Sequence, residues 1–274
     1  ALFYGGIAYL GLKRSKNNAV LSFFALAVAL VFLTIAIPIQ LGDIAWTTIA
    51  WAAEGAVLIF ISFYVGLPKL RVFGYLAFGV MTIRLVFFDL FVDLSDFTPI
   101  INERFGAFFT SIVLIYLAAL FINTKDESLM KWEQLRFSAK RILFVLANLL
   151  TLLLLTAEIL AYFDWLMNDL DETGRVGISD QRLENIKNLS VTALWTIYAV
   201  SLLVGGIVMK SQPIRIGGLI LLVIPIVKVF IYDVFILETV YRVIVFIGLG
   251  GLLLIGGYLY QRYRSVIREF ILSK

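Results

Sequence analysis

The chain has 274 residues, of which 61% are apolar and only 15% are charged, and its mean hydropathy is +0.97. Because a soluble chain carries charge on about a quarter of its residues, this composition excludes a soluble protein and indicates an integral membrane protein. The sequence contains no cysteine and no histidine, which excludes disulfides, thiolate catalysis and the commonest metal ligands, so we expect neither a metal nor a cofactor. The net charge of +4 comes from basic residues beside the membrane and does not indicate nucleic-acid binding.

Eight stretches are long and apolar enough to cross the hydrocarbon layer, which takes about 20 residues of helix. In chain order they are about 18–38, 43–66, 69–93, 104–123, 140–165, 188–209, 213–236 and 240–261. The segment Ala1 to Leu12 is also apolar but reaches only about 18 Å at 1.5 Å per residue. We therefore expect a partial span at the start and a longer parent protein. The predicted fold class is an all-α integral membrane protein, a polytopic helical bundle.

Basic residues alternate between the two sets of connecting loops. One set, which includes the C-terminal tail, holds 16 of them and the opposite set holds five, while Arg84 and Lys228 lie within spans. Because loops rich in lysine and arginine stay in the cytoplasm, the first set is predicted to be cytoplasmic. The C-terminus is then on the inside.

The second half of the chain repeats the first. Trp51, Arg71, Gly74, Arg84 and Asp89 recur 144 positions later as Trp195, Arg215, Gly218, Lys228 and Asp233. Arg104 and Phe108 recur as Arg242 and Phe246 at an offset of 138, and Thr34 recurs as Thr156 at an offset of 122. The shorter offset upstream indicates a longer outer loop in the second half, expected as a solvated loop from Trp165 to Lys187.

These matches predict two parallel four-helix repeats, since an even number of spans restores the orientation. The predicted divisions are 1–17 (partial span and cytoplasmic loop), 18–123 (first repeat), 124–139 (cytoplasmic linker), 140–262 (second repeat) and 263–274 (cytoplasmic tail). Transporters use such repeats, but duplication is also a simple way to build a large membrane bundle.

Charged residues inside the predicted spans, or at their outer ends, carry most of the functional information. They are Glu54, Arg84, Asp89, Glu158, Lys228 and Asp233. A charge in hydrocarbon costs about 2.5–3.5 kcal/mol on insertion scales, and pairing between helices reduces that cost. We therefore expect Glu54 and Glu158 to face the interior of the bundle. Their candidate partners are Arg84 and Lys228.

The two aspartates follow these bases by five residues. Five residues turn an α-helix by about 140°, so neither aspartate should reach the base that precedes it. The predicted partners of Asp89 and Asp233 are Arg104 and Arg242, which open the following helices at the same level.

Two interpretations of these charges stay open. They can form a buried polar site or a proton relay, or they can form ion pairs that lock the repeats together. Pro225 precedes Lys228 by three residues and is a hinge candidate, because a proline inside a helix frees a carbonyl and kinks the helix. A static kink is the alternative.

Several stretches resemble the family of bacterial multi-pass proteins catalogued as domain of unknown function 2339. They are Ile35-Ala-Ile-Pro-Ile-Gln-Leu, Ala50-Trp-Ala-Ala-Glu54-Gly, Val227-Lys-Val-Phe-Ile-Tyr-Asp233, Tyr241-Arg-Val-Ile-Val-Phe-Ile-Gly-Leu-Gly250 and Tyr258-Leu-Tyr-Gln-Arg262. The resemblance implies the C-terminal part of a long member, in a bacterial inner membrane. It also implies that Trp51, Glu54, Lys228, Asp233, Arg242 and Phe246 are recurring motif positions. It implies no activity.

No nucleophile elbow, phosphate loop, HExxH run or dinucleotide-binding glycine motif is present. We therefore expect a non-enzymatic membrane component that binds a partner protein, a lipid or a small solute. Membrane lipids are the expected partners, and a partner membrane protein is a further candidate. A solute or ion transporter that uses the buried charges is the alternative, and a lipid- or glycan-modifying enzyme with aspartate or glutamate as base is a weaker one.

Overall fold

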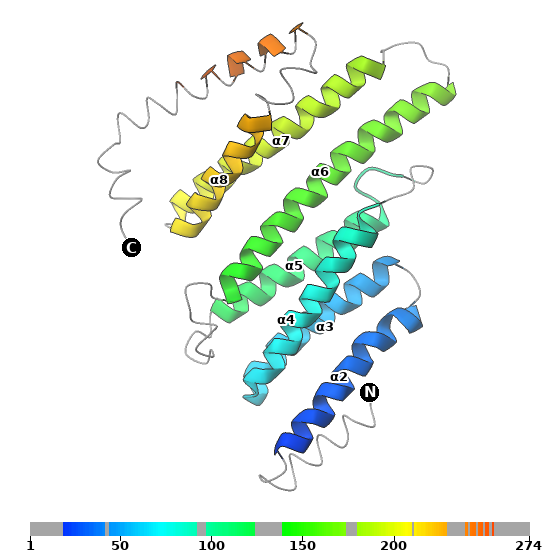
Figure 1. The fold of residues 1–274 in the computed structure, drawn as a ribbon, viewed down its shortest axis with the longest axis vertical. Helices are drawn as coiled ribbons and strands as arrows, with labels where there is room; N and C mark the ends of the chain where they lie inside the picture. Colours follow the sequence, from blue (N-terminus) through cyan, green and yellow to red (C-terminus); the bar gives the residue numbers. More distant parts are fainter. Residues whose placement is uncertain are drawn as a thin grey trace, which may run out of the picture. The chain divides into compact units, whose positions relative to one another are not determined.

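The computed structural model describes residues 19–41, 44–91, 97–123, 139–173, 180–209, 211–228 and part of 239–254, and these are helical apart from short turns (Figure 1). The helices with full bounds are α2 (Ala19–Leu41), α3 (Ile44–Val65), α4 (Pro68–Arg84), the π-helical turn η2 (Leu85–Asp89), α5 (Glu103–Asn123), α6 (Ala139–Thr173), α7 (Asp180–Val208) and α8 (Gln212–Lys228). The all-helical class is therefore confirmed.

Five of these helical stretches are long and apolar enough to cross a membrane. They are Ala45–Val65, Pro68–Asp89, Glu103–Ile122, Ala139–Leu170 and Gln181–Val208. A shorter apolar helix, Ala25–Leu41, lies where the first complete span was predicted. The predicted span 213–236 is described as α8 up to Lys228. The partial span 1–12 and most of 240–261 lie outside the described residues.

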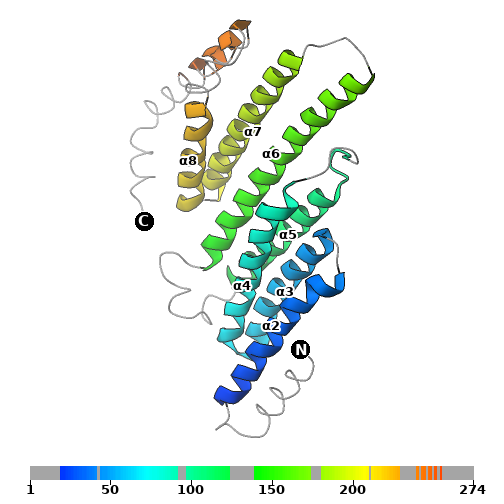
Figure 2. The same ribbon diagram turned by 45° about the vertical axis from the view of Figure 1, so that its right-hand side comes forward.

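The outer connection between the fifth and sixth predicted spans is mostly helical, so the expectation of a solvated loop from Trp165 to Lys187 was wrong. Helix α6 continues to Thr173 and α7 begins at Asp180 (Figure 2). Both are longer than α2 and α3, with 35 and 29 residues against 23 and 22. Hydropathy identifies only the apolar part of a helix. Polar residues with high helix propensity can continue the same helix beyond either end of that part.

The outer turns of α6 and α7 are held together by charge. The Lys187 Nζ atom lies 3.0 Å from Asp164 Oδ1, which joins α7 to α6, and 4.0 Å from Glu184 Oε1 one turn earlier on α7. A pair at this spacing within one helix adds about 0.2–0.5 kcal/mol to helix stability. These contacts explain why a segment with little apolar character still forms helix.

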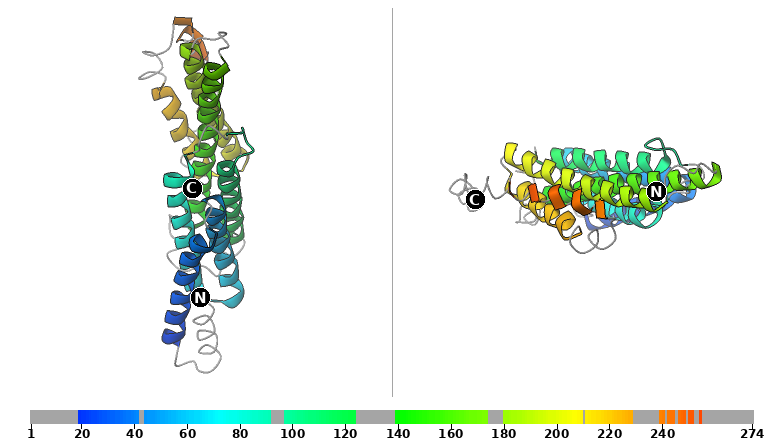
Figure 3. Two further views of the ribbon diagram at one scale, coloured as in Figure 1. Left: turned by 90° about the vertical axis from the view of Figure 1, so that its right-hand side faces the viewer. Right: turned by 90° about the horizontal axis from the view of Figure 1, so that it is seen from above.

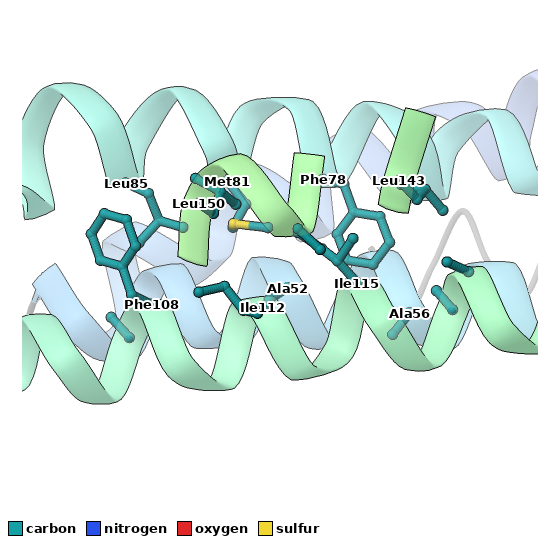
Figure 4. Packing of buried hydrophobic residues seen from close by; sticks show 14 of the residues in the cluster. Ala52, Ala56, Phe78, Met81, Leu85, Phe108, Ile112, Ile115, Leu143 and Leu150 are labelled. Carbon is teal, nitrogen blue, oxygen red and sulfur yellow. The ribbon is translucent and has the colours of Figure 1, made fainter. Parts of the chain in front are cut away.

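The chain divides into two compact units, residues 1–154 and 155–274, and the division lies within α6. The predicted linker 124–139 lies outside the described residues except for Ala139. In unit 1 the helices run alongside one another (Figure 3). Their core joins α3, α4, α5 and the first part of α6 through buried apolar side chains, among them Ala52, Ala56, Phe78, Met81, Leu85, Phe108, Ile112, Ile115, Leu143 and Leu150 (Figure 4).

Helices α3 and α4 form an antiparallel pair in unit 1. Gly66 has a positive φ of 70°, and the Leu67 N–H donates to the Ser62 carbonyl over 3.1 Å, so the chain turns back within two residues. Gly74 of α4 lies against α3, because a Cβ atom at Gly74 would stand 2.8 Å from the Gly55 carbonyl oxygen. The absence of a side chain at Gly74 is what lets the two backbones approach this closely.

Helices α7 and α8 form a comparable pair in unit 2. The Ser211 N–H donates to the Gly206 carbonyl over 2.9 Å at the turn. A Cβ atom at Gly218 of α8 would stand 3.1 Å from the Ala199 carbonyl oxygen and 2.8 Å from the Leu203 nitrogen on α7. The five residues in these contacts lie 144 positions after the residues that make the same contacts between α3 and α4. Ser211, Gly206, Gly218, Ala199 and Leu203 correspond in this order to Leu67, Ser62, Gly74, Gly55 and Ile59.

Candidate functional site

In unit 1, polar side chains of three helices meet around Trp51 of α3. The Trp51 indole N–H donates to the Thr34 carbonyl of α2 over 2.8 Å, and the Arg84 guanidinium of α4 lies 5.4 Å from the centre of the Trp51 ring. Thr48 and Glu54 stand three residues before and after Trp51 on the same side of α3. We call this group the Trp51 site; its members are Thr34, Thr48, Trp51, Glu54, Arg84 and Asp89.

Glu54 lies near the middle of the span Ala45–Val65 and is only 8% exposed. Its Oε1 atom is 2.9 Å from Thr34 Oγ1, which is also 3.0 Å from the Leu30 carbonyl oxygen. The Thr34 hydroxyl has one proton to donate, and it has two acceptors within hydrogen-bond distance, the Leu30 carbonyl and Glu54 Oε1. The Oε2 atom is buried and has no hydrogen-bond partner.

Arg84 and Asp89 form an ion pair within one helical segment. The prediction that Asp89 would point away from Arg84 around the helix and not reach it was therefore wrong. Arg84 Nε lies 3.8 Å from Asp89 Oδ1. The reason is the π-helical turn at Leu85–Asp89. In a π-helix the backbone bonds run between residues five apart, which places side chains at this spacing nearly above one another.

The same geometry corrects the predicted partners of Arg84 and Asp89. Arg84 contacts Asp89 and Trp51, so its expected pairing with Glu54 does not form. The charged partner of Asp89 is Arg84 and not the predicted Arg104. Arg104 instead donates to the Leu90 carbonyl over 3.3 Å. Arg104 also lies 5.8 Å from the centre of the Phe97 ring.

Asp89 is 4% exposed and lies at the end of its span. The Thr48 hydroxyl donates to Oδ2. The other oxygen, Oδ1, is too far from Arg84 Nε for a hydrogen bond, and both atoms are buried without a hydrogen-bond partner. The Trp51 site thus contains three such atoms, one donor on Arg84 and one carboxyl oxygen on each of Asp89 and Glu54.

Unit 2 carries related contacts around Trp195 and Lys228. The Trp195 indole N–H donates to the Thr156 hydroxyl over 2.9 Å. Lys228 Nζ donates to the Thr192 hydroxyl over 2.8 Å and lies 3.3 Å from the Asn188 carbonyl oxygen. Two of the contacts of Lys228 are therefore to neutral oxygens of α7.

The remaining predicted residues of unit 2 have simpler descriptions. Glu158 of α6 is buried, at 9% exposure. Pro225 is buried within α8, which continues past it to Lys228. Arg242 is half-buried, and Asp233 lies outside the described residues. The position 144 residues after Glu54 is occupied by Tyr198, so the mid-span carboxyl of α3 has no acidic counterpart in α7.

Sequence reasoning missed Thr48 and Thr192, whose hydroxyls contact Asp89 and Lys228. The two threonines are 144 positions apart, so the repeat itself contained the signal. Threonine is common in membrane helices, where its hydroxyl usually bonds to its own backbone. A polar partner on another helix is visible only in the tertiary structure.

The fold and the buried charges define a multi-pass helical membrane protein. Within the residues that the structure describes, no three acidic side chains are placed to hold a metal ion. The family model described as "Predicted membrane protein (DUF2339)" matches residues 70–263, and the chain belongs to this family. The match contains Lys228, Asp233, Arg242 and Phe246, whereas Trp51 and Glu54 precede it. No curated protein and no solved structure matched the chain.

Proposed function

We propose that this protein is a non-enzymatic component of a bacterial inner membrane that binds a small solute at the Trp51 site. The observation that carries this proposal is the pair of buried carboxyl oxygens without hydrogen-bond partners, Glu54 Oε2 and Asp89 Oδ1. A buried polar atom left unsatisfied costs about 1–3 kcal/mol, and native proteins keep few of them. A site that only locked the helices together would have these atoms satisfied within the protein.

Membrane lipids are the proposed partners of the outer face of unit 1. Large apolar side chains at the end of α4 and along η2 point outward; examples are Ile83, Phe87 and Phe88, each more than half exposed. Such a face suits hydrocarbon chains and also offers room for a partner membrane protein. Neither partner requires the buried carboxyl groups, so the solute is the better account of the Trp51 site.

Transport is the second candidate, and one observation favours it. The polar side chains extend from Asp89 and Thr48, at one end of their spans, inward to Glu54 at mid-span. Thr48 and Glu54 are six residues apart, about 9 Å along α3. A polar route that enters from one side of the membrane is the first half of a transport path.

Two further proposals concern architecture. We propose that residues 18–123 and 140–262 are parallel repeats of one four-helix fold, which the matched contacts at Gly74 and Gly218 support. The Trp51–Thr34 and Trp195–Thr156 contacts support it as well. We also propose a cytoplasmic C-terminus, supported by the alternation of basic residues between loops.

Native mass spectrometry of the full chain, released from nanodiscs, tests solute binding. The wild-type protein should carry an adduct that the double variant Glu54→Gln, Asp89→Asn lacks. Glu184→Gln, at an exposed position on α7, is the matched control and should keep the adduct. Identical adducts on wild type and the double variant would refute solute binding at the Trp51 site.

A further inference from the structure

The charges of Arg84 and Asp89 in the Trp51 site sum to zero. Arg84 and Asp89 compensate each other across 3.8 Å. Among the described residues no charged side chain acts on Glu54, which accepts a hydrogen bond from the Thr34 hydroxyl. A charged ligand would bring an uncompensated charge to the level of the spans, which is costly. We therefore expect a ligand that lies between Arg84 and Asp89 to be neutral.

The atoms without partners specify the functional group of this ligand. Arg84 Nε offers a hydrogen and Asp89 Oδ1 accepts one, and the two atoms are 3.8 Å apart. An oxygen about 2.8 Å from both would accept from Nε and donate to Oδ1. Among neutral groups a hydroxyl does both with one atom, whereas a carbonyl or ether oxygen cannot donate.

The second carboxyl group sets the spacing between hydroxyls. Glu54 Oε2 is also without a partner, and Glu54 lies about 9 Å further along α3 than Thr48, the residue that holds Asp89. One ligand that satisfies both ends needs hydroxyls several bonds apart. Trp51 lies between Thr48 and Glu54 along α3 and contacts Thr34 and Arg84, so we expect the carbon skeleton of the ligand to lie against its indole ring.

We propose that the Trp51 site binds a neutral polyhydroxyl group, such as a free sugar or the sugar headgroup of a glycolipid. This inference rests on the proposed function and specifies its solute. Both sources present the same hydroxyl chemistry to Arg84, Asp89 and Glu54. They differ in whether an acyl chain accompanies the sugar.

Three hexoses that differ in charge test the proposal. Radiolabelled glucose, glucosamine and glucuronate are presented to the full chain in nanodiscs, and monoglucosyl-diacylglycerol is compared with diacylglycerol in the nanodisc lipid. Wild type should retain glucose or the glucolipid about tenfold better than the charged hexoses or diacylglycerol, a difference of about 1.4 kcal/mol. Retention of glucose identifies a free sugar, and retention of the glucolipid alone identifies a headgroup.

Charge variants make the result independent of simple loss of folding. Arg84→Gln leaves the site negative and should shift the preference to glucosamine, whereas Asp89→Asn leaves it positive and should shift the preference to glucuronate. The combination of both substitutions restores neutrality and should restore the preference for the neutral sugar. Glu184→Gln is the control and should match wild type.

Two outcomes would overturn the inference. One is a wild-type preference for a charged hexose; the other is no retention of any sugar or of the glucolipid, which would leave water as the bridge between Arg84 and Asp89. In either case an adduct in the mass spectrum that depends on Glu54 and Asp89 would keep the proposed function intact, so the two failures are distinguishable.

Discussion

Arg84 and Asp89 lie five residues apart, and the π-helical turn between them brings Arg84 Nε within 3.8 Å of Asp89 Oδ1. An α-helix would point the two side chains about 140° apart. The wider turn therefore decides which charges meet at the end of this span. It also leaves Glu54 with the Thr34 hydroxyl as its polar contact.

The first prediction concerns this ion pair. Arg84→Met should lower the unfolding temperature of the purified protein in detergent, because it leaves Asp89 as a buried charge without compensation. Breaking a buried pair costs about 3–5 kcal/mol, and the low end applies because the Arg84 side chain is 19% exposed. Adding Asp89→Asn should recover most of the loss, whereas adding Glu54→Gln should not. Recovery by Glu54→Gln alone would mean that Arg84 pairs with Glu54 instead.

The second prediction concerns Thr48, whose hydroxyl donates to Asp89. Thr48→Val keeps the shape of the side chain and removes the donor, so it should destabilise the protein by about 1–3 kcal/mol in denaturant or thermal unfolding. Thr82→Val is the matched control on α4, because the Thr82 hydroxyl donates to the Phe78 carbonyl of its own helix and its loss costs little. Equal effects of the two variants would contradict the role assigned to Thr48.

The third prediction concerns the close helix contacts. Gly74→Ala should destabilise unit 1, because the added methyl would lie 2.8 Å from the Gly55 carbonyl oxygen, and Gly218→Ala should do the same in unit 2. Gly79→Ala and Gly217→Ala are the controls: nothing lies within 4 Å of a Cβ atom there. Alanine favours helix over glycine by about 1 kcal/mol, so the controls should be neutral or stabilising. Unfolding temperatures that rise in all four variants would exclude both close contacts.

The fourth prediction concerns orientation. The chain has no cysteine, so a single introduced cysteine reports on one loop. Cysteines at Ser15 and Ser211 should resist an impermeant thiol reagent in whole cells and react after permeabilisation, because both sites lie in the basic set of loops, which we propose to be cytoplasmic. A cysteine at Ser179 should react in intact cells. The opposite pattern would invert the proposed topology.

Much of the architecture was predictable because it depends on local sequence. A span needs only enough consecutive apolar residues to cross the hydrocarbon layer, so α3, α4, α5, α6 and α7 were located within a few residues at their apolar ends. Membership of the family followed from short motifs near Lys228 and Arg242, which lie inside the matched region. The buried position of Glu54 followed from the cost of charge in lipid.

Other features could not be predicted, because they depend on partners distant in sequence. Polar turns of α6 and α7 continue past the apolar segment and are joined by Lys187 and Asp164, 23 residues apart. Hydropathy contains no information on such pairs. The π-helical turn at Leu85–Asp89 leaves no mark in composition either, since its residues would suit an α-helix equally well.

The sequence by itself determined that this protein is a helical membrane protein and which charged residues lie among its spans. The free energy of transferring a segment from water to lipid depends mainly on the apolar and charged residues of that segment, so it can be judged without knowing the neighbouring helices. The tertiary structure decided which charges meet. Arg84 reaches Asp89 through one widened helical turn, Thr48 of another helix holds the second aspartate oxygen, and Glu54 is left with Thr34. Hydrogen bonds and ion pairs depend on distances below about 4 Å and on direction, and only the packed helices set these.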